Sequence, residues 1–92
     1  MGKFLAVHPV GPDMDMGAAQ PVGQAVKACC NADAYWVRSW YVPAEGKFYC
    51  EWDAKDLGAI QDALTRAGAA GAQMPLEGIY PIAASIFGED FR

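Results

Sequence analysis

The sequence predicts a two-layer α+β sandwich in which one antiparallel sheet carries both helices on a single face. Two observations lead to this prediction. Apolar and aromatic runs mark four strands and helical spacing marks two helices, and their order along the chain is strand, helix, strand, strand, helix, strand. Right-handed connections then give the ferredoxin-like βαββαβ arrangement, with sheet order 4-1-3-2. The 92 residues have room for one domain, residues 1–92.

The first half of the chain begins with a short apolar strand, residues 3–8, which ends before a proline. Residues 9–19 are rich in Gly, Pro and Asp, a composition typical of a loop. Pro21 suits the first position of a helix, because its fixed φ is helical and its missing N–H is not needed there. Apolar residues then recur at helical spacing as far as Cys30, and Asn31 can end the helix.

The second half begins with a predicted hairpin. Residues 34–42 and 47–53 are rich in aromatic and β-branched types, and Pro-Ala-Glu-Gly at 43–46 forms the turn between them. Asp53 is expected to cap the second helix, which Gly68 ends.

The last strand is expected at residues 77–82, so that the core of the domain spans 3–82. Residues 83–92 form a tail that contains Ile86, Phe87 and Phe91. Such apolar side chains predict that the tail packs on a sheet edge or on a partner rather than standing free in water.

Composition and charge exclude several classes of protein. The net charge is −4, and the seven Lys and Arg residues do not cluster, which argues against binding to nucleic acid. No apolar stretch approaches the roughly 20 residues of a membrane helix, and the start of the chain lacks the apolar core of a signal peptide. Three cysteines, two of them adjacent, are a poor disulfide framework and fit a reducing compartment. The expected location is therefore the cytoplasm.

Cross-strand pairing in the hairpin divides its side chains between two faces of the sheet. A simple register over the turn pairs Ser39 with Cys50 on one face, and Arg38 with Glu51 on the other. The first face is the more apolar and is predicted to lie under the helices; it carries Val37, Ser39, Tyr41, Phe48, Cys50 and Trp52. The second face carries Trp36, Arg38, Trp40, Tyr49 and Glu51, with Asp53 at its end.

The second face of the hairpin has no helix to cover it in a single chain. Tryptophan, tyrosine and arginine are enriched at the centres of interfaces, so this face predicts a homodimer or a ligand that covers the aromatic rings. A simpler interpretation is that these aromatics only favour the strand conformation and are half shielded by long neighbours.

Several motifs in the hairpin and the second helix resemble a widespread bacterial family of unknown function. They are Trp36-x-x-Ser39-Trp40, Lys47-Phe48-Tyr49-Cys50, Asp53-Ala54-x-Asp56 and the helix end Arg66-Ala67-Gly68. One actinobacterial member is described as a nickel-binding protein with a ferredoxin-like fold that dimerises. The resemblance covers roughly residues 34–82 and implies a divalent transition metal, nickel, as the ligand. None of its motifs is a catalytic signature, so it does not imply an enzyme.

Candidate metal ligands are few. The resemblance points to Cys50, although a lone buried cysteine is more often a small apolar core residue. His8, at the end of the first strand, is the single histidine and can serve as a ligand or a general base. Thiolate and imidazole together suit nickel or zinc. Further donors would have to come from carboxylates or phenols, such as Glu77, Asp13, Asp15, Tyr41 and Tyr49, or from a second subunit.

Three classes of function stay open from the sequence. The first is a small cytoplasmic homodimer that binds a divalent metal at His8 and Cys50. The second is a dimeric α/β-barrel that binds a small molecule or acts on one, by analogy of fold alone. The third is an interaction module without catalysis.

Overall fold

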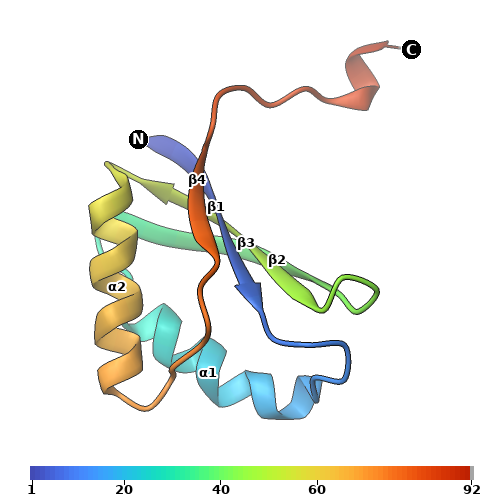
Figure 1. The fold of residues 1–92 in the computed structure, drawn as a ribbon. Coiled ribbons are helices and arrows are strands. Elements are labelled where there is room, and N and C mark those ends of the chain that lie inside the picture. Colours follow the sequence, from blue (N-terminus) through green and yellow to red (C-terminus); the bar gives the residue numbers. More distant parts are fainter. Residues whose placement is uncertain (92) are drawn as a thin grey trace.

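The computed structural model describes residues 1–91 and confirms an α+β fold with four antiparallel strands and two helices (Figure 1). The strands and helices are β1 (Gly2–Pro9), α1 (Met16–Ala28), β2 (Ala34–Val42), β3 (Lys47–Ala54), α2 (Leu57–Ala69) and β4 (Gly78–Ile82), with a short 3₁₀ turn, η1, at Gly88–Phe91. No helix in this described part of the chain is long and apolar enough to cross a membrane.

The sheet has the strand order β2-β3-β1-β4, and all neighbouring pairs are antiparallel. Counted from the β4 edge, the neighbours are the same as in the order 4-1-3-2. Both helices lie on one side of the sheet, and the other side is open (Figure 1). This arrangement gives the sheet a helix face and an open face, and the candidate sites differ between them.

Helix α1 begins earlier than the sequence predicts. Asp15 is its N-cap and accepts a hydrogen bond from the backbone N–H of Gly17 at 2.9 Å. Pro21 therefore lies inside the helix rather than at its first position. Its ring removes only one backbone hydrogen bond near the N-terminus, and the Asp15 cap holds the preceding turn. Residues 16–19 of the expected loop 9–19 are consequently helical.

Helix α2 is capped by Asp56 and not by Asp53. The Asp56 carboxylate accepts from the backbone N–H of Ala59 at 2.9 Å, which is the contact that defines an N-cap. Asp53 instead stays in β3, where it pairs with Lys3 across the sheet. Asp53 and Asp56 are equally good caps by residue type. Because β3 extends to Ala54, Asp53 belongs to the strand, and Asp56 is the residue that caps the helix.

The hairpin turn at residues 43–46 forms as predicted. Gly46 adopts a positive φ of 67°, and a Cβ at this position would come within 3.2 Å of the backbone of Gly11. The carbonyl of Gly46 accepts from the N–H of Gly11 at 2.8 Å. Glycine therefore lets the turn dock against the segment that leaves β1.

The two helices pack on the sheet in different ways. Helix α2 buries Ile60 together with the small side chains of Ala59, Ala63 and Ala67, which let its backbone approach the sheet closely. Helix α1 fully buries Val26 alone. The core is therefore dense under α2, and space remains between α1 and the sheet.

The tail leaves the sheet after β4 and extends away from the domain (Figure 1). Ile86, Phe87 and Phe91 are 79%, 64% and 76% exposed. Packing on the sheet edge of the same chain, one of the two predicted arrangements, is therefore wrong for the described residues. The chain turns outward after β4, so its apolar side chains never meet the core. Packing on a partner stays a prediction.

Candidate functional site

A cavity of about 430 Å³ lies between helix α1 and the helix face of the sheet. Its walls are mainly aromatic, aliphatic and thioether side chains with a few polar groups. The lining residues are His8, Met14, Met16, Ala19, Gln20, Val22, Gly23, Val26, Trp36, Ser39, Tyr41, Phe48, Cys50, Trp52, Leu64 and Met74. A concave, mostly apolar space of this size with a small number of polar groups is typical of a binding site for a small molecule.

Trp36 is on this face because β2 contains a bulge. Arg38 pairs with Glu51 as predicted, but Trp36 pairs with Trp52, and the register shifts between Trp36 and Arg38. Trp36 was predicted on the open face, and that placement is wrong. The extra residue in the bulge, Val37, turns outward and is 41% exposed. The large indole ring thus packs toward the core and the smaller Val37 side chain faces solvent. This arrangement buries more apolar surface than the reverse placement of the two side chains.

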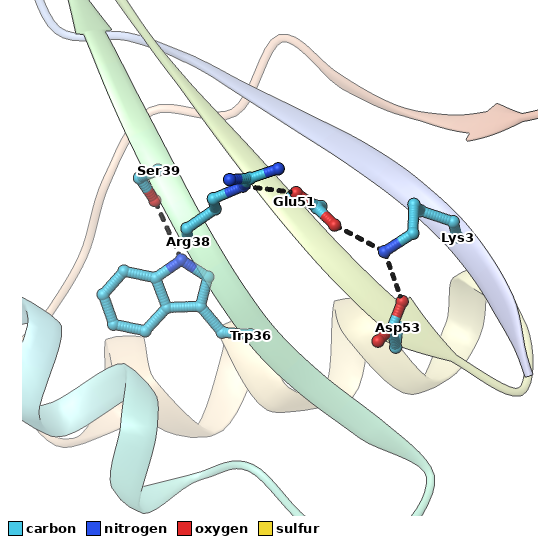
Figure 2. A network of polar contacts seen from close by, with 6 residues as sticks. All are labelled: Lys3, Trp36, Arg38, Ser39, Glu51 and Asp53. Carbon is cyan, nitrogen blue, oxygen red and sulfur yellow. Dashed lines mark hydrogen bonds and ion pairs between the residues drawn. The ribbon is translucent and has the colours of Figure 1, made fainter. Parts of the chain in front are cut away.

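The bulge is held by side-chain hydrogen bonds on an edge strand. The indole Nε1 of Trp36 donates to Ser39 Oγ at 2.8 Å, across the bulge (Figure 2). The Lys27 ammonium of α1 donates to the carbonyl of Trp36 at 2.9 Å. The Trp-x-x-Ser spacing is the sequence signal for this arrangement, since it allows Trp36 to reach Ser39 across the bulge.

Cys50 lies on the helix face at the end of a polar chain. The Ser39 hydroxyl, which accepts from Trp36, donates to Cys50 Sγ at 2.9 Å. Burial raises the pKa of the Cys50 thiol, and the hydrogen bond from Ser39 opposes this shift in part. Cys50 is therefore a protonated thiol at neutral pH, and it becomes a thiolate ligand only when a metal displaces the proton.

His8 is 1% exposed and lies on the same face of β1. Its Nδ1 is 2.9 Å from the carbonyl oxygen of Pro75, and its Nε2 is buried without a hydrogen-bond partner among the described residues. Burial lowers the pKa of His8, although the Pro75 hydrogen bond acts in the other direction. His8 is thus a neutral imidazole that lines the cavity together with Cys50.

The further donors considered from the sequence do not join His8. Glu77 pairs with the ammonium of Lys47 at 2.8 Å, and Asp15 caps α1. The Tyr41 hydroxyl donates to the carbonyl of Gly11 at 2.7 Å and accepts from the N–H of Met14 at 3.1 Å. Tyr41 therefore fixes the loop that brings Met14 to the cavity.

The open face of the sheet carries a separate charge network. Glu51, which is 8% exposed, accepts from Arg38 at 2.8 Å and also pairs with Lys3 (Figure 2). Lys3 continues to Asp53 at 2.8 Å. Hydrogen bonds from Lys3 and then from Arg38 lower the pKa of Glu51. The Arg38–Glu51 pair is confirmed, whereas sequence reasoning missed Lys3, whose position depends on the long-range pairing of β1 with β3.

Two aromatic residues remain on the open face as predicted, Trp40 and Tyr49, which are register partners. Trp40 is 44% exposed, and the Arg38 guanidinium lies 4.9 Å from its ring centroid. Tyr49 donates its hydroxyl to Glu45. The open face thus keeps a large exposed ring beside an ion pair in which the Glu51 carboxylate is buried and the Arg38 side chain is exposed.

The described residues do not supply a complete metal site. No group of three or more His, Cys, Asp or Glu side chains among residues 1–91 is placed to hold an ion. His8 and Cys50 line the same cavity, and one thiolate would leave a divalent ion with uncompensated charge in apolar surroundings. The residues present therefore fit nickel only as a partial ligand set.

Comparison of the sequence with curated proteins gives no significant match. A solved structure similar in fold is the crystal structure of SCO4226 from Streptomyces coelicolor A3(2), with a TM-score of 0.72 and 23% sequence identity. The similarity covers 91% of this chain and 99% of that one. A family model described as nickel responsive protein SCO4226-like matches residues 4–78. Since that match spans most of the sequence and agrees with the resemblance seen in its motifs, the chain belongs to the SCO4226-like family.

Proposed function

We propose that this protein binds a small, mainly apolar molecule in the cavity between α1 and the sheet. The observation that carries the proposal is the cavity itself, about 430 Å³ with aromatic and thioether walls and two buried ring nitrogens, on His8 and Trp52, that lack partners in the described chain. A folded protein rarely leaves such groups unpaired inside its core, and a ligand can satisfy them.

Equilibrium dialysis with naphthalene, a flat apolar probe that the cavity can contain, tests this proposal. Ala19 lines the cavity, and its neighbour Ala18 is exposed on the same helix. Ala19→Phe should weaken naphthalene binding at least tenfold because the new ring occupies the cavity, while Ala18→Phe should bind like the wild type. Equal binding by both variants would show that naphthalene sits elsewhere.

The second candidate is binding of a divalent metal, nickel in the first place. Its support is membership of a family described as nickel responsive, together with the unpaired Nε2 of His8 in the same cavity as Cys50. Imidazole and thiolate suit nickel and zinc, and the remaining ligands would come from solvent or from a second subunit.

Calorimetric titration of nickel and zinc separates this candidate from the first. His8→Ala and Cys50→Ser should each weaken binding far more than Cys29→Ser, the matched control on α1's C-cap. Binding should also weaken at acid pH, because protons compete for both donors. The same weak affinity in the wild type and all three variants would remove the metal candidate.

We also propose that the protein is a homodimer through the open face, defined by Arg38, Trp40, Tyr49 and Glu51. The large exposed ring of Trp40 supports that arrangement, as does the fact that no helix of residues 1–91 covers this side of the sheet.

A further inference from the structure

The hydrogen-bonding partner of His8 fixes which of its ring nitrogens carries the proton. A carbonyl oxygen only accepts, so the 2.9 Å contact with Pro75 requires the proton on Nδ1. Burial lowers the pKa of His8 and keeps the ring neutral. The Nε2 atom is then a bare lone pair, so within the neutral ring it can only accept a hydrogen bond.

Trp52 presents the opposite chemistry. Its indole Nε1 is a donor and never an acceptor, and it is buried with no partner among the described residues. Trp52 is itself 1% exposed and lines the same cavity as His8. A buried polar group without a partner destabilises the fold, so both ring nitrogens would gain from a ligand that pairs with them.

The strand register separates the backbones of these two residues along the sheet. His8 pairs with Phe48, and Trp52 lies four residues further along β3, about 13 Å at the usual rise per residue. Cys50 lies between them on the same face. Side chains of Phe48 and Met74 contribute to the apolar walls. The cavity therefore has an acceptor toward one end and a donor toward the other, with mainly apolar walls and the Cys50 thiol between them.

Resting on the proposed small-molecule function, we propose that the ligand is a flat, mainly apolar molecule with a hydroxyl or N–H donor at one end and a carbonyl-type acceptor at the other. The donor pairs with His8 Nε2 and the acceptor pairs with Trp52 Nε1. Molecules of this class include hydroxyaryl ketones and related phenolic carbonyl compounds. The polarity of the ligand is thus set by the tautomer that Pro75 imposes on His8.

Each ring nitrogen is sealed from water by its neighbours, so a ligand that reaches it must move a side chain. Met74 and His8 both line this cavity, and both also border a second cavity. An unbranched thioether side chain changes rotamer at low cost and can make this room.

Four probes of one size test the inference by equilibrium dialysis. They are naphthalene, a naphthol with only the hydroxyl, acetylnaphthalene with only the carbonyl, and an acetylnaphthol with the two groups at opposite ends. In the wild type each polar group should tighten binding about tenfold, so the acetylnaphthol should bind tightest. His8→Phe should abolish the gain from the hydroxyl alone, and Trp52→Phe the gain from the carbonyl alone. Trp40→Phe, on the open face, should preserve both gains.

Three other outcomes would overturn the inference. Equal binding of all four probes to the wild type would contradict it while leaving the apolar cavity and the proposed function intact. A hydroxyl gain lost in Trp52→Phe instead of His8→Phe would show that the polarity is reversed. Absence of binding by every probe, naphthalene included, would contradict the proposed function as well. The wild-type comparison stands even where a variant fails to fold.

Discussion

His8 is a buried neutral histidine, and that state has a consequence for stability. In the folded chain burial lowers the pKa of His8, while in the unfolded chain it returns to about 6.5. Between these values the unfolded state binds more protons, so the free energy of unfolding should fall as the pH drops below about 6.5. The loss from Glu51, whose pKa is also lowered, begins only below its ordinary value of about 4.3.

Denaturant titrations between pH 7 and pH 5 check this prediction. Because His8 is the only histidine of the chain, His8→Phe should flatten the pH dependence in this window. A wild-type curve that is already flat, or the same slope in the variant, would show that His8 is not a buried neutral group.

At the level of residues, the sequence indicates part of the site. His8 is indicated by its residue type and Cys50 by the family resemblance, and both line the cavity. The tautomer of His8 and the unpaired nitrogen of Trp52 were not predictable, because they depend on Pro75 and on packing between distant segments. Long-range contacts of this kind leave no local pattern in a sequence.

The helices and strands are predicted correctly where the periodicity of apolar residues is strong. The prediction fails where a single residue alters the strand register or the start of a helix. The hairpin register is correct from Arg38 to the turn. It fails at Trp36, since one extra residue in β2 moves every side chain before it to the other face. The start of α1 was missed because Pro21 was treated as a boundary, although Asp15 provides a better cap.

The bulge in β2 places Trp36 and Trp40 on opposite faces of the sheet, so we expect their removal to have different effects on stability. Trp36→Ala should lower the free energy of unfolding by about 3 kcal/mol, because it removes a ring that packs between β2 and α1 and a hydrogen bond to Ser39. Trp40→Ala should cost clearly less in the monomer, since Trp40 is 44% exposed. Equal losses in denaturant unfolding at low protein concentration would contradict the bulged register.

For the whole molecule, the one-sided helix layer was predictable from the order of the elements, and the course of the tail was not.

The open face leads to a prediction about assembly. Sedimentation equilibrium should show a dimer for the wild type and a monomer for Trp40→Glu, because the new charge would be buried in the interface close to the Glu51 carboxylate. Ser39→Ala, on the helix face, is the control and should stay dimeric. A wild-type chain that sediments as a monomer at high concentration would remove the dimer.

The central claim is that the cavity between α1 and the sheet holds a small apolar ligand, and the three tryptophans report on it directly. Trp36 and Trp52 line the cavity, whereas Trp40 lies on the open face. In nitrogen-resolved NMR spectra each indole N–H gives its own signal. Addition of naphthalene should shift the signals of Trp36 and Trp52 in a saturable manner and leave that of Trp40 in place. A shift of Trp40 alone, or no shift at any indole, would contradict the account.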